Sequence, residues 1–474
     1  MSLDPVLANI VDELATSHEQ FDRDHPGEPA LRQPVHTVYG GAHLFRHDVA
    51  QRLGVRALEA LDRHGGDPVT FARAIGLPGC DDLPPRNKDV AKLVEAVRTD
   101  RDAARRERPS AWLAVTVFDR VVAKLGREPI EDFRIDFEDG FGPRSDDEED
   151  DAAIAAAHAL TRGRQEDTLP PFIGIRIKSL DAQTKRRAAR TLQLFFETLA
   201  DDPAVRGLAR FVVTLPKVRL PDEVRALDRM LAHLEDAHGF PQGWSRIEIM
   251  TESGASFFGA DGRLALASLL EAAEGRAIGV HFGTYDFSAS LDVAAGSQSM
   301  GHPLCTLALG LMKVGLSGRG VFVSDGATNR LPVGVHRGEG LTKKQRRQND
   351  TSVRRAWALS HANIRRSLAM GLYQGWDVHP AQLPVRYAAN YGFFLEELPH
   401  ATQRLRRFVE AAARASVTGN TFDDAASALG LLAFFARGHQ CGALSTDEIE
   451  RAGVTLAETR ERSFAAIVTR RAGS

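Results

Sequence analysis

Two acidic residues, Glu252 and Asp286, each follow an apolar segment of the chain. The segments read RIEIMTE (246–252) and AIGVHFGTYD (277–286), and we interpret each as a buried strand that ends in a carboxylate. Residues 264–274 between them have helical spacing, so the two strands run parallel and both acids emerge at the same end of the sheet. Mg²⁺ prefers such hard oxygen ligands and keeps other positions for water and substrate. Each acid alone would suit a helix cap, but the pair favours a metal site.

Further polar residues follow other strand-like segments. They are Asp136, Glu138 and Asp139 after the second segment, Arg176 in the third, Lys217 after the fourth, and Asp377 and His379 in the eighth. An arginine within an apolar strand is costly unless it faces a carboxylate, so Arg176 is a candidate anion ligand. Lys217 is either a catalytic group or an ion-pair partner of Asp136 or Glu138. His379 precedes a proline, and we expect a structural role for it.

Eight strand-like segments must position these side chains. They are Val35 to Phe45, Phe133 to Phe141, Phe172 to Lys178, Phe211 to Val218, Ile247 to Glu252, Ile278 to Phe287, Gly320 to Asp325, and Gly375 to His379. Amphipathic helices such as 183–199 and 221–238 fill most of the gaps. The alternation predicts an α/β fold, a (β/α)₈ TIM barrel, with an open doubly wound sheet as the alternative. No GxGxxG follows a strand, which weakens a dinucleotide-binding version of that alternative.

The predicted barrel, residues 34–384, carries three additions. Residues 1–33 form an N-terminal helical segment, 46–132 a helical insertion after the first strand, and 385–474 a helical C-terminal extension. The extension carries apolar stripes that must be buried. We expect it to cover the barrel mouth or to pack against a neighbouring subunit.

The composition limits the expected binding partners and indicates the cellular compartment. With 60 basic and 63 acidic residues the formal net charge is -3, which gives no bulk attraction to nucleic acid. The three cysteines are far apart and odd in number, which fits a reducing cytoplasm. No apolar stretch reaches the ~20 residues that span a membrane, and the N-terminus is no signal peptide. We therefore expect a cytoplasmic protein with no nucleic-acid or membrane partner.

The motifs, in order, resemble those of the citrate lyase β-subunit (CitE-like) and HpcH/HpaI aldolase superfamily. The matching segments are Asp136-Phe-Glu-Asp139, Arg176, Pro216-Lys217, Glu252-Ser253, Gly283-Thr-Tyr-Asp286, Asp325-Gly326 and His379-Pro-Ala-Gln382, all within about 130–384. The resemblance implies a TIM barrel in which Glu252 and Asp286 bind Mg²⁺, with Mn²⁺ as a substitute, and Arg176 binds a substrate carboxylate. The backbone amides of Gly283 and Thr284 would add hydrogen-bond donors.

The chain departs from this superfamily in three places. Asp139 stands where the aldolase branch has its acid/base histidine, so the citrate-lyase-like branch fits better. The first strand reads HTVYGGAH (36–43) in place of an arginine and a Val-Pro-Gly-like turn. The long extension resembles that of malate synthase, a more distant barrel in which a C-terminal helical domain supplies a catalytic Asp. Asp423, Asp424 and Asp447 are the candidates here.

These patterns imply a Mg²⁺-dependent carbon–carbon lyase or synthase that acts through a metal-stabilised enolate. Its substrate would be a small 2-oxo or hydroxy acid, free or as a CoA thioester, and the protein a homo-oligomer. The expected catalytic residues are Arg176, Asp139, Glu138 and Lys217, and the expected substrate-binding residues are Arg176, Gly283, Thr284 and Asp136. The alternatives are a metal-dependent aldolase on free 2-oxo acids and a catalytically inactive barrel that serves as a binding or regulatory subunit.

Overall fold

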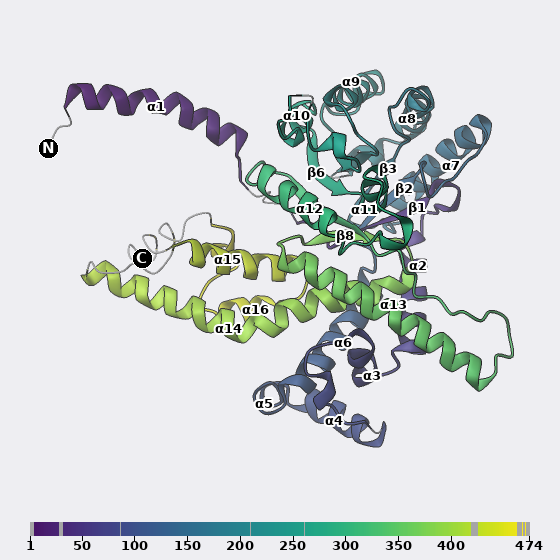
Figure 1. The fold of residues 1–474 in the computed structure, drawn as a ribbon, viewed down its shortest axis with the longest axis vertical. Helices are drawn as coiled ribbons and strands as arrows, with labels where there is room; N and C mark the ends of the chain where they lie inside the picture. Colours follow the sequence, from purple (N-terminus) through teal and green to yellow (C-terminus); the bar gives the residue numbers. More distant parts are fainter. Residues whose placement is uncertain are drawn as a thin grey trace.

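The computed structural model describes residues 4–27, 32–85, 87–208, 210–259, 261–418, 425–461, 467 and 470. Eight parallel strands close into a barrel in chain order, with β8 paired to β1 (Figure 1). The strands are β1 His36–Gly41, β2 Asp132–Asp136, β3 Phe172–Arg176, β4 Phe211–Leu215, β5 Ser245–Thr251, β6 Ala277–Phe282, β7 Phe322–Ala327 and β8 Gln374–Asp377. The predicted (β/α)₈ barrel is confirmed, and closure excludes the open sheet.

All eight predicted strands exist, but several end earlier than their apolar runs suggest. After β1 the chain enters a short 3₁₀ helix, Ala42–Leu44, which was predicted as strand. After β6 it enters helix α11, Thr284–Ser290, so Asp286 lies in the first helical turn and not at the end of a strand. An acid in that position complements the positive end of the helix dipole, which explains why the strand gives way to a helix here.

Helices follow each strand and form the layer outside the barrel. In chain order after β2 they are α7 Asp146–Gln165, α8 Lys185–Ala200, α9 Pro221–Ala237, α10 Leu266–Glu271, α12 Pro303–Gly315, α13 Lys343–Ala369 and α14 Leu383–Thr418. The first turn of α7 is acidic, Asp146–Glu149, and it begins with a capping box in which Ser145 and Glu148 accept from each other's backbone amides. Phe195, Phe211 and Trp244 are buried between β4 and its neighbouring helices, where their rings stack.

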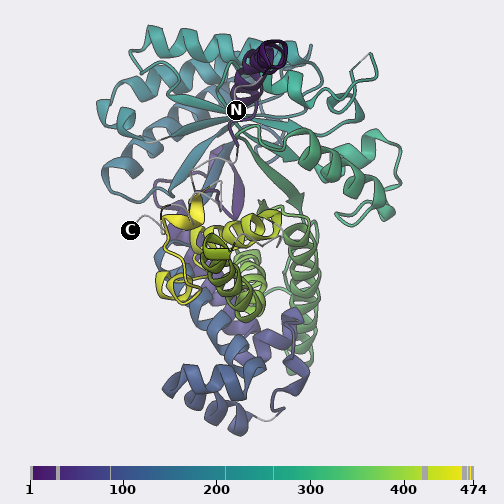
Figure 2. The same cartoon turned by 90° about the vertical axis from the view of Figure 1, so that its left-hand side faces the viewer.

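The segment between β1 and β2 is mainly helical. It comprises α2 Val49–His64, α3 Pro68–Ile75, α4 Asn87–Thr99, α5 Arg101–Glu107 and α6 Pro109–Arg127. Helix α6 packs against α2, α3 and α14, and α3 also packs against α13. In Figure 2 these helices form a second mass on the side of the barrel where α13 and α14 also lie.

The described part of the C-terminal segment, residues 385–418 and 425–461, does not cover the barrel mouth. Helix α15, Ala425–Gln440, packs on α14, and its Arg437 donates to the Gln33 side chain and lies over the Tyr373 ring. Gln33 precedes β1 and Tyr373 precedes β8, so both mark the N-terminal end of the barrel, opposite the mouth. The expectation of a cover over the mouth is therefore wrong. The apolar stripe is instead buried against α14, with Leu432 and Phe435 in the core.

Two of the three acids considered as a C-terminal catalytic Asp, Asp423 and Asp424, lie outside the described residues. The third, Asp447, is in α16, Thr446–Glu450, and is exposed. The ion pair between Glu448 and Arg120 holds α16 to α6. Asp447 does not line the cavity at the mouth. The division of the chain into separate units stays a prediction, because α14 packs on the insertion as well as on α15.

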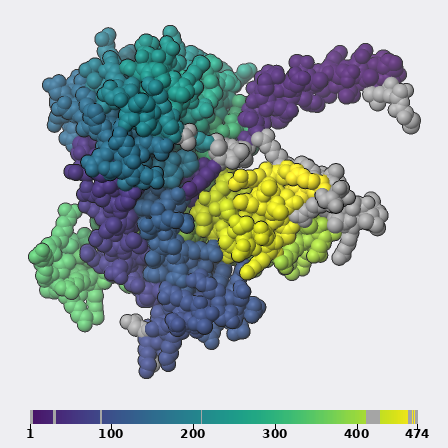
Figure 3. Space-filling view, turned by 180° about the vertical axis from the view of Figure 1, so that it is seen from behind, coloured from purple at the N-terminus to yellow at the C-terminus, as the bar shows by residue number. Residues whose placement is uncertain are grey.

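Helix α1, Pro5–Asp24, projects from the body of the molecule (Figure 3). None of its residues is buried, and Leu7, Ile10, Val11 and Leu14 are all about half exposed or more. Within the described part of the chain, no helix is long and apolar enough to cross a membrane. Cys80, Cys305 and Cys441 are free thiols, which agrees with the absence of a predicted disulfide framework.

Candidate active site

The carboxyl ends of the strands open on a cavity of about 870 Å³. Of the residues predicted for the site from the sequence, the following line it: Asp136, Asp139, Arg176, Gly283, Thr284 and Asp286. Glu138, Lys217 and Glu252 do not line the cavity. Glu138 pairs with Arg176, Lys217 lies near Asp286, and Glu252 packs against Gly283, all of which line it. Helix α2 of the insertion forms one wall, so the insertion shapes the mouth. Of the described C-terminal helices, α14 contributes only its first residue, Leu383, and α15 and α16 contribute none.

Arg176, the last residue of β3, is buried and forms a two-point ion pair with Asp136 of β2. Its Nε and Nη2 donate to the two Asp136 oxygens at 2.7 and 2.6 Å. Asp136 also accepts from the backbone amides of Glu138 and Gly140. The side-on edge of the guanidinium that suits a carboxylate is thus occupied by the protein. A substrate carboxylate can reach Arg176 through its remaining N–H groups, and Nη1 also contacts Glu138 at 3.1 Å.

Lys217 places an ammonium group among three carboxylates. Its Nζ lies 2.5 Å from Glu138, 3.2 Å from Asp139 and 3.9 Å from Asp286. Of the two ion-pair partners considered from the sequence, the structure selects Glu138. Although burial opposes the charge, the hydrogen bond to Glu138 and these three acids raise the pKa of Lys217 above its ordinary value. The lysine is therefore a cation at neutral pH.

The backbone of Lys217 has φ +54°, a left-handed conformation that is uncommon for a residue other than glycine. In this conformation its amide donates to Glu252 at 2.8 Å. Strain of this kind persists only where the surrounding structure compensates for it, and it is concentrated at functional sites. The turn after β4 is thus shaped to hold the Glu252 carboxylate.

Glu252, directly after β5, is 4% exposed. Among the described residues its carboxylate receives the Lys217 backbone amide and has no side-chain cation within ion-pair distance. Burial raises its pKa, and the nearby negative charges of Asp286 and Glu138 raise it further, to about 8. A Cβ on Gly283 would come within 2.4 Å of the Glu252 side chain, so only glycine fits against it.

Asp286 lies at the same end of the barrel as Glu252, and its side chain is 48% exposed. Glu252 directly follows β5, whereas Asp286 lies in α11, which follows the neighbouring strand β6. The two acids affect each other electrostatically. In the local cluster five carboxylates face two cations, Arg176 and Lys217. The excess of negative charge and the buried Glu252 carboxylate without a cationic partner suit a bound cation.

Within the described residues, no group of three or more His, Cys, Asp or Glu side chains is arranged around a metal position. Mg²⁺ does not require such a group, because it is commonly held by one or two carboxylates, with water and substrate as the other ligands. Glu252 and Asp286 fit this limited role. A metal that needs a full set of protein ligands, such as structural zinc, does not fit them.

The remaining motif residues have mainly structural partners. Asp325 is buried and accepts from Ser367 and from the Gly326 amide. His379 lines the cavity and accepts from the Ala381 amide, which agrees with its expected structural role. Thr284 lines the cavity, but its hydroxyl is buried against Gly326 and has no hydrogen-bond partner among the described residues. The Gly283 amide, expected as a donor to substrate, instead donates to the Thr251 carbonyl at 3.2 Å.

The sequence analysis missed several residues of the mouth. The Tyr39 ring of β1 lies 4.7 Å from the Arg176 guanidinium and 5.0 Å from the Trp376 ring. Further lining residues come from the start of α2 and the loop before it, namely Arg46, Val49, Arg52, Leu53 and Arg56. Their spacing in the sequence is that of one face of a helix, but only the fold shows that this face is turned toward the site.

Comparison with solved structures finds distant likenesses. A Haloferax volcanii malate synthase in a ternary complex with pyruvate and acetyl-CoA is 16% identical, with a TM-score of 0.40, over 54% of this chain and 60% of that chain. The same enzyme with magnesium and glyoxylate is 17% identical, with a TM-score of 0.41, over 54% and 65%. Protein CitE from Mycobacterium tuberculosis, in complex with magnesium and acetate, is 18% identical, with a TM-score of 0.35, over 58% and 87%.

The match thus spans less than two thirds of the length of the two malate synthase chains. No curated protein matches the sequence. A family model described as "Domain of unknown function (DUF6986)" matches residues 14–467, so the chain belongs to this family.

Proposed function

We propose that this protein is a Mg²⁺-dependent carbon–carbon lyase or synthase that acts on a small 2-oxo or hydroxy acid, free or as its CoA thioester. The observation that carries the proposal is the buried Glu252 carboxylate, which has no cationic side-chain partner among the described residues and lies near Asp286. The motif resemblance to the citrate lyase β-subunit superfamily supports the same pair of ligands. We keep a cytoplasmic homo-oligomer as part of this proposal.

Mg²⁺ held by Glu252 and Asp286 would supply a Lewis acid for an oxygen on which negative charge develops. Around that position the chain offers two further groups for a substrate. Arg176 attracts a carboxylate while Asp136 fixes its orientation. The Thr284 backbone amide, at the start of α11, would provide a hydrogen-bond donor.

Lys217 and Glu138 are the candidates for proton transfer. They lie 2.5 Å apart, and burial raises the pKa of Glu138 although Arg176 opposes the rise. The neighbouring Asp139 instead has a lowered pKa, because the charges of Arg176 and Lys217 outweigh its burial. Two adjacent carboxyl groups with opposite shifts suit one proton donor and one ionised group.

The size of the cavity bears on whether the substrate is a free acid or a CoA thioester. About 870 Å³ exceeds what a small oxo acid fills, and the α2 arginines line the part of the mouth contributed by the insertion. This favours a substrate with an arm beyond the reacting acid. The aldolase on free 2-oxo acids and the inactive barrel remain the alternatives, and one assay separates all three.

The test is an end-point screen by mass spectrometry with the purified full chain. Short 2-oxo acids are incubated alone and with acyl-CoAs, each with Mg²⁺ or with EDTA. We expect a product only with Mg²⁺ and a thioester, and none from the Glu252→Gln or Asp286→Asn variant. Glu271→Gln, which makes the same chemical change at an exposed position of α10, serves as the matched control and should retain activity.

Conversion of free 2-oxo acids alone would favour the aldolase. Absence of turnover, together with an unchanged unfolding midpoint for every acid, thioester and Mg²⁺ combination, would favour the inactive barrel. Equal activity of Glu252→Gln and the wild type would contradict the proposed role of the metal.

A further inference from the structure

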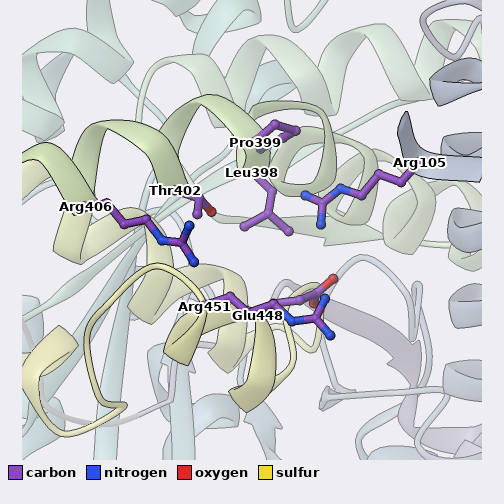
Figure 4. A pocket seen from close by; sticks show the side chains of 7 residues that line it. All are labelled: Arg105, Leu398, Pro399, Thr402, Arg406, Glu448 and Arg451. Atoms are coloured by element: carbon purple, nitrogen blue, oxygen red, sulfur yellow. The ribbon is translucent and has the colours of Figure 1, made fainter. Parts of the chain in front are cut away.

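A second polar hollow lies away from the barrel mouth, where the insertion meets the C-terminal helices. It has a volume of about 220 Å³ and is lined by Arg105, Leu398, Pro399, Thr402, Arg406, Glu448 and Arg451 (Figure 4). Arg105 belongs to α5, Arg406 to α14, and Arg451 follows α16 directly. Figure 4 shows Arg105 and Arg406 reaching toward the hollow from opposite sides.

The hollow carries more positive charge than its own carboxylate can neutralise. Among the described residues Glu448 is the single acid in its lining, and that carboxylate is already engaged. It accepts two hydrogen bonds from Arg120 at 3.0 and 3.2 Å and one from the Ser445 amide. Three arginines therefore face one acid that is already paired with a fourth arginine.

The three arginines have few partners of their own among the described residues. Arg406 forms no hydrogen bond or ion pair there, and Arg105 contacts the Trp112 ring at 4.8 Å. Arg451 has a long ion pair of 3.7 Å with Asp102, and both side chains are more than half exposed. Such exposed pairs contribute little, so they do not offset the excess charge. Burial lowers the pKa of Arg105, and the charges of Arg451 and Arg120 add to this effect, although Glu448 and Asp102 oppose it.

Helix ends explain part of this arrangement but not all of it. Arg105 lies in the last turn of α5 and Arg451 caps α16, where a cation complements the helix dipole. Arg406 lies in the interior of the 36-residue helix α14, where no such effect operates. A neighbouring hollow of about 180 Å³ shares Arg105, Glu448 and Arg451 with the first. It adds two arginines, Arg101 and Arg120, and two acids, Asp102 and Asp447, so its lining has four arginines and three acids. The charge excess therefore extends over both hollows.

We propose that this hollow is a binding site for a phosphate group, carried by a small phosphorylated metabolite or present as inorganic phosphate. A phosphate offers several acceptor oxygens in different directions, which matches guanidinium groups that arrive from three separate segments. Thr402 adds a hydroxyl donor to the same lining. The buried Leu398 limits the space on one side, so the site suits a compact ligand.

Occupation of the site would join elements that are far apart in the sequence. The ligand would contact α5 of the insertion, α14, and the segment after α16 at the same time. A ligand that binds only this folded arrangement stabilises it. The inference is independent of the chemistry at the mouth, because the two sites share no residue.

Isothermal titration calorimetry on the full chain tests the site. The probes are inorganic phosphate, glycerol 3-phosphate and malonate, each at constant ionic strength against chloride. We expect binding of at least one phosphate probe, weakened about tenfold or more by Arg406→Gln, as for loss of one charge-assisted bond. Arg406→Lys should show a smaller loss, because lysine keeps the charge but not the planar fork.

Arg355→Gln, at an exposed position of α13 with no ion pair to any described residue, is the matched control and should bind like the wild type. Arg52→Gln tests the competing location at the mouth. Tighter binding of glycerol 3-phosphate than of phosphate identifies a phosphorylated metabolite, and equal binding identifies the free ion. The proposal is overturned if neither phosphate probe binds, if malonate binds more tightly than both, or if Arg52→Gln abolishes binding while Arg406→Gln does not.

Discussion

Replacement of Glu252 by glutamine should stabilise the metal-free protein at alkaline pH. The folded protein holds the pKa of Glu252 at about 8, against an ordinary value of 4.5, because burial and the Asp286 charge oppose ionisation. A difference of about 3.5 pH units, at about 1.4 kcal/mol per unit, gives an upper limit of about 5 kcal/mol. Since proteins relax around buried charges, we expect about 2–5 kcal/mol.

The direction in which stability changes with pH follows from the number of protons that the folded and unfolded states bind. Between about pH 4.5 and 8 the folded state binds the Glu252 proton and the unfolded state does not, so stability falls as the pH rises and levels off above 8. The glutamine of the variant cannot titrate, and its side-chain oxygen can still accept the Lys217 amide. The variant should therefore lack this part of the pH dependence.

Urea unfolding in EDTA, followed by circular dichroism from pH 5 to 9, measures the effect. The difference between wild type and variant removes the contribution of groups that titrate alike in both proteins. Glu271→Gln controls for the loss of one surface charge. A difference that stays constant over the whole pH range would refute the reasoning, because it would mean that Glu252 ionises normally in the folded protein.

Three further changes have outcomes that follow from the structure. Arg176→Lys should weaken substrate binding by about 1.5–3 kcal/mol and lower the unfolding midpoint, because lysine cannot form the two-point hydrogen bond to Asp136. Unchanged steady-state kinetics and an unchanged midpoint would contradict this. Deletion of residues 1–24 should change the free energy of unfolding by less than about 0.5 kcal/mol in urea titrations, because α1 buries none of its residues; a larger loss would show that α1 packs elsewhere. Phe435→Ala should cost about 3–5 kcal/mol by the same measurement, because its ring is fully buried against α14, whereas a cost below about 1 kcal/mol would contradict that packing.

The barrel was predictable because its strands are apolar runs separated by amphipathic helices. Residues such as Phe211 to Leu215 and Ile247 to Met250 are buried on both faces, which makes the run continuous. The ends of the strands were less predictable than their existence. The segment from Gly283 to Asp286 was predicted to continue the sixth strand, yet it begins α11, because local sequence does not show at which residue a strand ends.

The candidate residues were found, but their partners were not. The sequence could show that Arg176 needs a carboxylate, yet only the register of β2 with β3 selects Asp136. Lys217 contacts Glu138 and not Asp136 for the same reason. Apolar stripes showed that α15 must be buried, but no pattern in them distinguishes the mouth from the N-terminal end of the barrel, and the expectation of the mouth was wrong.

Direct measurement of metal binding tests whether Glu252 and Asp286 share one ion. Mn²⁺, as a paramagnetic substitute for Mg²⁺, is titrated into the wild type, Glu252→Gln, Asp286→Asn and the control Glu271→Gln, and free Mn²⁺ is followed by electron paramagnetic resonance. With two protein ligands, binding should tighten when a 2-oxo acid supplies further oxygens. We expect one site in the wild type and in the control, from which Mg²⁺ displaces Mn²⁺, and loss of that site in each of the other two variants. Retention of the site in both of those variants would contradict this expectation.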